Sequence, residues 1–247
     1  MHQFEIAPIF PIEAGGFDIS FTNSSLWMCI VAGVAGAFML ASSSKRALIP
    51  SRLQSVGEIS YEMLSGMVKN VMGEEGMVFF PFIFTLFMFI LFSNMIGMIP
   101  GSFTVTSHIA VTAALAFAIF FTVIIVGFWR HGLKFLMLFV PAVPPLLLPL
   151  LVPIEIISFL SRPLSHSIRL FANMLAGHAM LFMFGTFVVG LAAAGGAISL
   201  LSALPLLGIV VVSALEFLIA FLQAYVFAIL ACIYLNDALH LHHGDDH

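Results

Sequence analysis

Five long runs of apolar residues restrict what this chain can fold into. They cover about residues 26–41, 77–99, 109–128, 135–193 and 197–236. A helix needs about 20 apolar residues to cross the hydrocarbon of a bilayer, so the runs are long enough to span it, the first one with help from its flanks. Only 8% of the residues are charged, against roughly 25% in a soluble domain. The sequence therefore predicts an all-α polytopic membrane protein with about five membrane segments.

The basic residues predict which way the chain crosses the membrane. They gather after the first and third runs, at Lys45, Arg46, Arg52, Arg130 and Lys134. Cytoplasmic loops carry an excess of Lys and Arg, and residues 100–108 between the second and third runs carry none. We therefore expect the N-terminus outside and the C-terminus in the cytoplasm.

Three further features exclude other kinds of protein. Residues 1–25 contain acidic residues and no Lys or Arg, so they lack the basic start of a secretory signal and are expected to stay in the mature protein. Cys29 and Cys232 lie inside apolar runs, where a thiol packs as a small hydrophobe, so we expect neither a disulfide nor a metal site. The net charge of −4 is small and scattered, which argues against nucleic-acid binding.

The connecting segments suggest three regions, residues 1–76, 77–134 and 135–247. Residues 51–76 place apolar side chains at helical spacing among charged ones, which predicts an amphipathic helix lying at the inner membrane surface. An ordinary solvated loop helix is the alternative. Residues 141–153 contain five prolines, which predict a membrane-adjacent turn instead of a regular long helix.

The last two apolar segments, about 150–193 and 198–237, predict a helical hairpin that turns at Gly195-Gly196. Counting back from this turn places three pairs of polar residues opposite each other: Glu155 with Asp237, Arg169 with Gln223, and His178 with Glu216. A helix of about 40 residues would be about 60 Å long, twice the thickness of the hydrocarbon. The hairpin must therefore tilt steeply or break, and Pro163 is expected to bend its first helix.

His178 and Glu216 are the strongest candidates for moving protons. Histidine titrates near neutral pH, and a carboxyl group in an apolar site is pushed toward the same range. With the turn outside, this pair would belong to an outward-facing path. Glu155 and Asp237 lie about 21 Å along their helices from the level of Arg169, toward the inside, and would serve an inward-facing path.

Arg169 is a cation in an otherwise apolar stretch. A guanidinium at mid-membrane depth costs about 2.5–3.5 kcal/mol and does not lose its proton. It can attract a carboxylate of a partner and stop protons leaking between the two paths. Asn173 and Gln223 are expected to hold it through hydrogen bonds.

Each of these residues also has a purely structural explanation. His178 alone would be a core histidine, a reading that the matched Glu216 reverses, while Glu155 and Asp237 could simply be solvated near an interface. Polar residues that either line an outer vestibule or merely end a loop are Asn94, Ser107 and His108. Histidines of the tail that either bind metal adventitiously or stay solvated are His240, His242, His243 and His247.

Two stretches resemble a known family. They read Ser-Arg-Pro-Leu-Ser-His-Ser-Ile-Arg-Leu-Phe-Ala-Asn-Met-Leu-Ala-Gly-His (161–178) and Leu-Glu-Phe-Leu-Ile-Ala-Phe-Leu-Gln-Ala-Tyr-Val-Phe (215–227). Support comes from Ser-Asn-Met-Ile-Gly-Met-Ile-Pro (93–100), Thr-Ser-His (106–108) and Ile-Glu-Ile-Ile-Ser (154–158). Together they resemble subunit a of the F-type ATP synthase, the stator half of its proton channel, over nearly all of the chain from residue 77.

The resemblance implies a role for each polar residue of the hairpin. Arg169 resembles the arginine that faces the ring of c subunits, with Asn173 and Gln223 as its neighbours. His178 and Glu216 resemble the outer half-channel, and Glu155 and Asp237 resemble acidic residues of the inner one. The implied partners are the c-ring, the b-type subunits of the peripheral stalk, the rest of the synthase and the lipid bilayer.

The resemblance also implies a location. His on the first helix and Glu on the second is similar to the mitochondrial arrangement, whereas many bacterial members have these types exchanged. We nevertheless expect the bacterial inner membrane in preference to the mitochondrial one.

Two other kinds of protein remain possible from the residues alone. A secondary ion-coupled transporter would use intramembrane charges to bind substrate, but such folds often contain inverted repeats, and the two halves of this chain show none. An assembly protein without transport would leave Arg169, His178 and Glu216 unexplained. The chain lacks a P-loop, so we expect no phosphoryl chemistry and no cofactor. H⁺ and Na⁺ both remain open as the coupling ion.

Overall fold

The computed structural model describes residues 8–10, 13–14, 17–18, 20–43, 51–99, 102–140 and 147–239. Five of its helices are long and apolar enough to cross a membrane. The prediction of an all-α polytopic membrane protein with about five membrane segments is confirmed. The basic loop at Lys45 and Arg46, the prolines at 141–145 and the histidine tail lie outside the described residues.

Short strands precede the first helix and were not predicted. β1 (Pro8–Phe10) pairs with β4 (Phe21–Thr22), and β2 (Glu13–Ala14) pairs with β3 (Phe17–Asp18), both antiparallel. The pairs are two or three residues long, too short for a period-two pattern to stand out in the sequence. Helix α1 (Asn23–Ser43) follows and contains the first apolar run.

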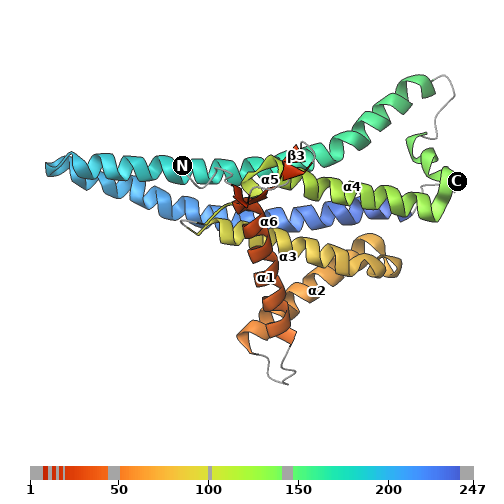
Figure 1. The fold of residues 1–247 in the computed structure, drawn as a ribbon, viewed down its shortest axis with the longest axis horizontal. Coiled ribbons are helices and arrows are strands. Elements are labelled where there is room, and N and C mark those ends of the chain that lie inside the picture. The colour runs from red at the N-terminus through yellow and green to blue at the C-terminus, as the bar shows by residue number, and fades with distance from the viewer. Residues whose placement is uncertain are drawn as a thin grey trace. The chain divides into compact units, whose positions relative to one another are not determined.

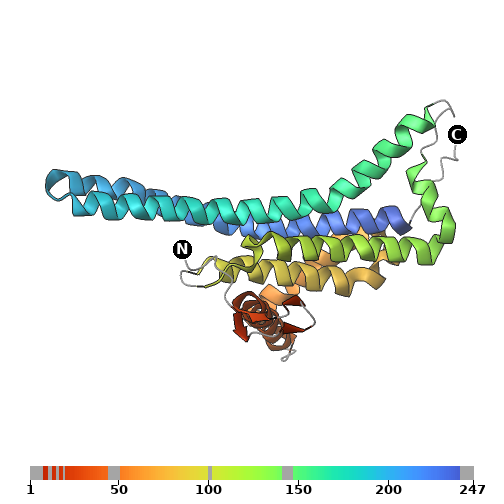
Figure 2. The ribbon, with the colours of Figure 1, turned by 45° about the horizontal axis from the view of Figure 1, so that its top comes forward.

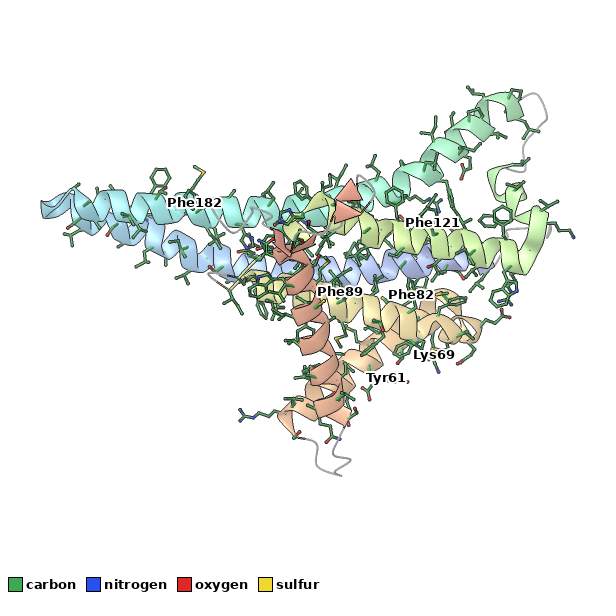
Figure 3. All side chains as sticks on the ribbon, in the orientation of Figure 1. Tyr61, Lys69, Phe82, Phe89, Phe121 and Phe182 are labelled. Atoms are coloured by element: carbon green, nitrogen blue, oxygen red, sulfur yellow. The ribbon has the colours of Figure 1, made fainter. Side chains whose placement is uncertain are left out.

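Helix α2 (Arg52–Met72) fulfils the prediction of a helix within residues 51–76. The Ser51 side chain accepts a hydrogen bond from Gln54 N and so caps the first turn, and Leu64, Met67 and Val68 form its buried face. Figure 3 labels Tyr61 and Lys69 on this helix, both exposed. Its position at the membrane surface remains a prediction.

The middle of the chain is a pair of apolar helices with short 3₁₀ segments around them. In chain order these are η2 (Glu74–Phe79), α3 (Phe80–Gly97), η3 (Val105–Ser107), α4 (Ile109–His131) and η4 (Gly132–Phe139). Exposed aromatic side chains such as Phe121 on α4 are those expected on a surface that faces lipid (Figure 3).

The predicted hairpin is present. Helix α5 (Leu148–Ala193) and helix α6 (Ala203–Leu239) are joined through η5 (Gly196–Ser202). Gly195 and Gly196 have φ of +68° and +62°, a left-handed conformation that residues with a Cβ rarely adopt, which explains why the turn falls on this glycine pair.

The proline prediction was partly wrong. Helix α5 begins at Leu148 and runs through Pro149, Pro153 and Pro163. Pro149 lies in the first turn, where a missing N–H is not needed, and membrane helices tolerate internal prolines better than soluble ones do. The 46 residues of α5 correspond to about 69 Å, so the length argument for a tilted hairpin remains.

Contacts divide the chain into two compact units, and both contain parts of α5 and α6. The first unit consists of residues 1–36, 88–109 and 169–225. Within it, the parts of α5 and α6 that lie nearest the turn run side by side (Figures 1 and 2). The second unit consists of residues 37–87, 110–168 and 226–247.

Candidate functional site

The central contact of the first unit joins α5 to α6. His178 Nδ1 lies 3.1 Å from Glu216 Oε1, and the two side chains are 11% and 4% exposed. The sequence placed these residues opposite each other, and that prediction is confirmed. A basic ring and a carboxyl group are thus brought together in an apolar environment where little water screens them.

Backbone carbonyl groups surround the His178 ring. Nδ1 lies 2.8 Å from Met174 O, one turn back on α5, and Nε2 lies 2.9 Å from Gly97 O at the end of α3. Thr104 Oγ1 lies 3.1 Å from Nε2. Sequence reasoning missed Gly97 and Thr104, because neither residue type signals a site and a backbone carbonyl leaves no mark in the sequence.

A glycine makes room for the Glu216 side chain. A Cβ built at Gly177 would lie 2.6 Å from Glu216 Oε1 and 2.9 Å from its Cδ, closer than real Cβ contacts allow. Neither carboxylate oxygen of Glu216 accepts a hydrogen bond from the part of the chain that the structure describes. The carboxylate is therefore confined by packing while both of its oxygens remain able to take a proton.

Asn94 secures the segment that carries Thr104. Its Nδ2 donates to Ala220 O at 3.2 Å, and its Oδ1 accepts from Thr106 Oγ1 at 2.8 Å. Both Asn94 and Thr106 are fully buried. Asn94 thus ties residues 102–108 to α3 and α6 and does not line an open vestibule.

The other two vestibule candidates have local roles as well. The Ser107 hydroxyl is buried and donates to Thr104 O at 2.7 Å. The His108 ring stacks on Phe103 at 4.8 Å, and burial lowers the pKa of His108 below its usual 6.5. His108 is therefore neutral at physiological pH.

Arg169 lies differently from the sequence prediction. Asn173 Nδ2 donates to Gln223 Oε1 at 3.0 Å, so the two amides bond each other. Gln223 is buried, whereas Arg169 is exposed and has no hydrogen bond or ion pair among the described residues. The expectation that Asn173 and Gln223 hold the guanidinium was wrong. Arg169 and Asn173 lie one turn apart on α5, but only the Asn173 amide bonds to α6, while Arg169 stays exposed.

The acidic residues of the second unit also pair differently from the prediction. Asp237 Oδ2 lies 3.1 Å from Arg162 Nη1, and the Arg162 guanidinium sits over the rings of Tyr234 and Phe159 at 5.1 and 5.6 Å. Glu155, predicted opposite Asp237, is half-buried and forms no ion pair among the residues with described positions. Far from the turn, the pairing of α5 with α6 no longer follows the residue count. Asp237 therefore meets Arg162, which lies about two turns further along α5 than Glu155.

A small cavity borders this ion pair. Arg162, His166 and Tyr234 line its polar side, and the remaining walls are apolar residues of α4 and α5. The His166 ring lies 4.2 Å from the ring of Phe227 and is buried. The sequence did not single out Arg162 or His166, and it gave no sign of the rings of Phe159 and Tyr234 beside the guanidinium.

The described residues contain no group of three His, Cys, Asp or Glu side chains close enough to bind a metal. The two clusters consist instead of single acid–base pairs in apolar surroundings. The pair of His178 and Glu216 can hold and pass a proton, whereas the Arg162 guanidinium keeps its protons and serves to hold Asp237.

Comparison with known proteins gives a consistent result. The family model described as ATP synthase A chain matches residues 25–236. The chain is 57% identical to the ATP synthase subunit a of Chelativorans sp. (strain BNC1) over 244 residues, which cover 98% of each chain. It is 54% identical to the subunit a of Mesorhizobium japonicum, over 98% of this chain and 97% of that one. The subunit a of Nitrobacter winogradskyi is 54% identical over 98% of each chain.

Proposed function

Because the chain belongs to the family of ATP synthase A chains, we propose that it provides two offset half-channels for protons on either side of Arg169. It is the proton-channel subunit of an F-type ATP synthase, a multi-pass protein of the bacterial plasma membrane. The half-channels would deliver protons to a ring of c subunits and receive them back. The subunit itself would catalyse no reaction, and phosphoryl transfer would take place elsewhere in the complex.

The pair of His178 and Glu216 supports the outer half-channel. The Glu216 carboxyl group is only 4% exposed, faces the His178 ring through Oε1, and has no hydrogen-bond partner for Oε2 among the described residues. Burying such a group costs free energy, which favours a functional role over a structural one. The buried network around Asn94 holds α3 and α6 together beside it. This geometry is the observation on which the proposal rests most firmly.

Arg169 would separate the two half-channels. Its exposed guanidinium is available to a partner, and Asn173 and Gln223 bond each other without engaging it. At about 4 Å and an effective dielectric of 20, the attraction to a partner carboxylate is about 4 kcal/mol. That is strong enough to deprotonate a passing carboxyl group on the ring and weak enough to let it move on.

Glu155 and Asp237 would belong to the inner half-channel. Asp237 is 30% exposed and paired with Arg162, and Glu155 is half-buried. The basic residues Arg52, Arg130 and Lys134 support a cytoplasmic position for the ends of helices that lie near them, with the N-terminus outside. The b-type subunits of the peripheral stalk would hold the chain still against the ring.

Replacement of Glu216 by Gln tests the outer path. We expect ATP-driven proton pumping into inverted vesicles to fall at least about tenfold, because the amide has nearly the same shape and cannot carry the proton. Glu62→Gln, which changes an exposed acid on α2, is the matched control and should pump normally. A Glu216→Gln complex that pumps at the normal rate from about pH 6 to about pH 8 would remove this residue from the path.

Replacement of Arg169 by Ala tests the barrier. The complex should assemble, but proton-driven ATP synthesis should be lost, because nothing then discharges the ring carboxyl group or blocks leakage. Arg130→Ala removes an exposed cation that pairs with Glu75 and should leave synthesis intact. Normal synthesis by the Arg169→Ala complex would refute the assigned role.

A further inference from the structure

The surroundings of His178 define its charge. Each ring nitrogen faces a backbone carbonyl oxygen, Nδ1 that of Met174 at 2.8 Å and Nε2 that of Gly97 at 2.9 Å. A carbonyl oxygen only accepts hydrogen bonds, so each contact at this distance requires a proton on the nitrogen. A neutral imidazole carries only one such proton. Both contacts are satisfied together only when both nitrogens carry protons.

The alternative tautomer meets a specific obstacle. Thr104 Oγ1 is 3.1 Å from Nε2, but its hydroxyl donates to Gly97 O at 3.3 Å, so it could donate to an unprotonated nitrogen only by giving up that hydrogen bond. The Nε2 lone pair would then face the Gly97 oxygen at 2.9 Å with no proton between them, which is repulsive. Gly97 also ends α3, so its carbonyl has no partner within the helix and faces two groups outside it, the Thr104 hydroxyl at 3.3 Å and Nε2 at 2.9 Å.

One acidic group balances this charge. Glu216 Oε1 lies 3.1 Å from Nδ1 and is the charged group that the described residues of α3, α6 and the 102–108 segment bring to the ring. Nδ1 lies 2.8 Å from Met174 O and 3.1 Å from Glu216 Oε1, so the carboxylate balances the charge of the ring from one side. Glu216 Oε2 accepts no hydrogen bond from the described residues and remains open to a proton from elsewhere.

We propose that His178 is a fixed imidazolium that positions Glu216 and sets its charge, and that Glu216 alone takes up and releases the proton. The inference rests on the proposed function and assigns different roles to the two residues of its outer path. A proton from the outer water adds to a Glu216 oxygen and makes the neutral acid. This leaves the imidazolium without a counter-charge, so the loaded state is short-lived and the proton passes to a carboxylate of the partner. Thr104 and Gly97 hold the ring and are positioning residues.

Nitrogen NMR of the intact complex, with ¹⁵N-histidine in this chain only, tests the proposal. The chain has nine histidines, and the signals lost in His178→Gln identify residue 178. We expect both of its nitrogens to appear protonated from about pH 6 to about pH 8. In Glu216→Gln the counter-charge is gone, and one nitrogen should deprotonate within that range. An unprotonated nitrogen at residue 178 in the unmodified complex near pH 7 would overturn the proposal.

A functional comparison separates charge from proton exchange. His178→Lys keeps a positive charge, whereas His178→Gln keeps hydrogen-bonding capacity without charge. Proton pumping by the Lys complex should exceed that of the Gln complex by at least about fivefold. Equal or greater pumping by the Gln complex would contradict the fixed-charge role. Normal pumping by Glu216→Gln, together with a doubly protonated His178 in the unmodified complex, would remove Glu216 from the proposed outer path and leave the charge assignment of His178 standing.

Discussion

Gly177 shows how one small residue affects the geometry of the pair of His178 and Glu216. It precedes His178 on α5, and the Glu216 carboxylate occupies the space where a side chain would begin. The backbone of α5 thereby approaches the α6 carboxylate more closely than any other residue would permit. The short distance between His178 and Glu216 therefore depends on the absence of a Cβ at residue 177.

Gly177→Ala should therefore displace Glu216. Alanine is the better helix former by about 1 kcal/mol, so the helix itself should gain stability. We nevertheless expect proton pumping to fall about tenfold as the carboxylate moves away from His178. Gly185→Ala, on the same helix and with open space around the added Cβ, is the control and should retain pumping. Full activity of Gly177→Ala would show that the close approach is dispensable.

For individual residues, the sequence predicted the titratable side chains of the site better than the residues that hold them in place. The matched positions of His178 and Glu216 were visible because both are rare residue types in an apolar hairpin. Gly97, Thr104 and Gly177 act through a carbonyl, a hydroxyl and an absent atom, and no such property can be distinguished from ordinary helix or loop residues without coordinates.

Within the second unit, α5 and α6 are joined by the ion pair of Arg162 and Asp237. The two side chains are 27% and 30% exposed, so water screens the pair in part. The aromatic rings of Phe159 and Tyr234 limit how far the guanidinium can move. This pair should therefore contribute more than a typical surface pair.

A double-mutant cycle of Arg162→Gln and Asp237→Asn should give a coupling of about 1 kcal/mol. Hydrogen exchange of the amides in the last turns of α6 would measure this coupling. Each single variant should speed local opening about fivefold, and the double variant should open no faster than either single one. The corresponding cycle on Lys69 and Glu74, whose side chains are 49% and 81% exposed, should show coupling near zero. Equal coupling in the two cycles would mean that the aromatic contacts add nothing.

Helix pairing was predictable near the turn and less so far from it. Counting from Gly195-Gly196 assumes that both helices advance equally, an assumption that holds over a few turns. η5 is a 3₁₀ segment with a longer rise per residue, and α5 contains Pro153 and Pro163. These irregularities shift the register, which is why Glu155 and Asp237 do not meet.

In the whole chain, the two units do not follow the order of the sequence. The boundary between them crosses α5 between Ile168 and Arg169, and α6 between Tyr225 and Val226. The pair of His178 and Glu216 falls in the first unit, and the pair of Arg162 and Asp237 falls in the second. Each proposed half-channel thus has its titratable residues in a unit of its own.

The orientation of the whole chain can be tested by labelling single cysteines. After Cys29 and Cys232 are replaced, Leu133→Cys and Ala194→Cys each introduce one exposed thiol. A membrane-impermeant maleimide should label Leu133→Cys in inverted vesicles and Ala194→Cys in right-side-out vesicles, because the basic residues near Leu133 favour the cytoplasm. The opposite pattern would reverse the proposed direction of both half-channels.

The exposed guanidinium of Arg169 also bears on how the complex is built. In a newly inserted chain this charge has no carboxylate beside it among the described residues, at a cost of about 2.5–3.5 kcal/mol if it lies at mid-membrane depth. That corresponds to about 70- to 370-fold in an equilibrium constant. Docking of a partner that carries a carboxylate removes the penalty. The residue proposed to keep the two proton paths apart would then also make the unassembled subunit the less stable species and so favour its incorporation.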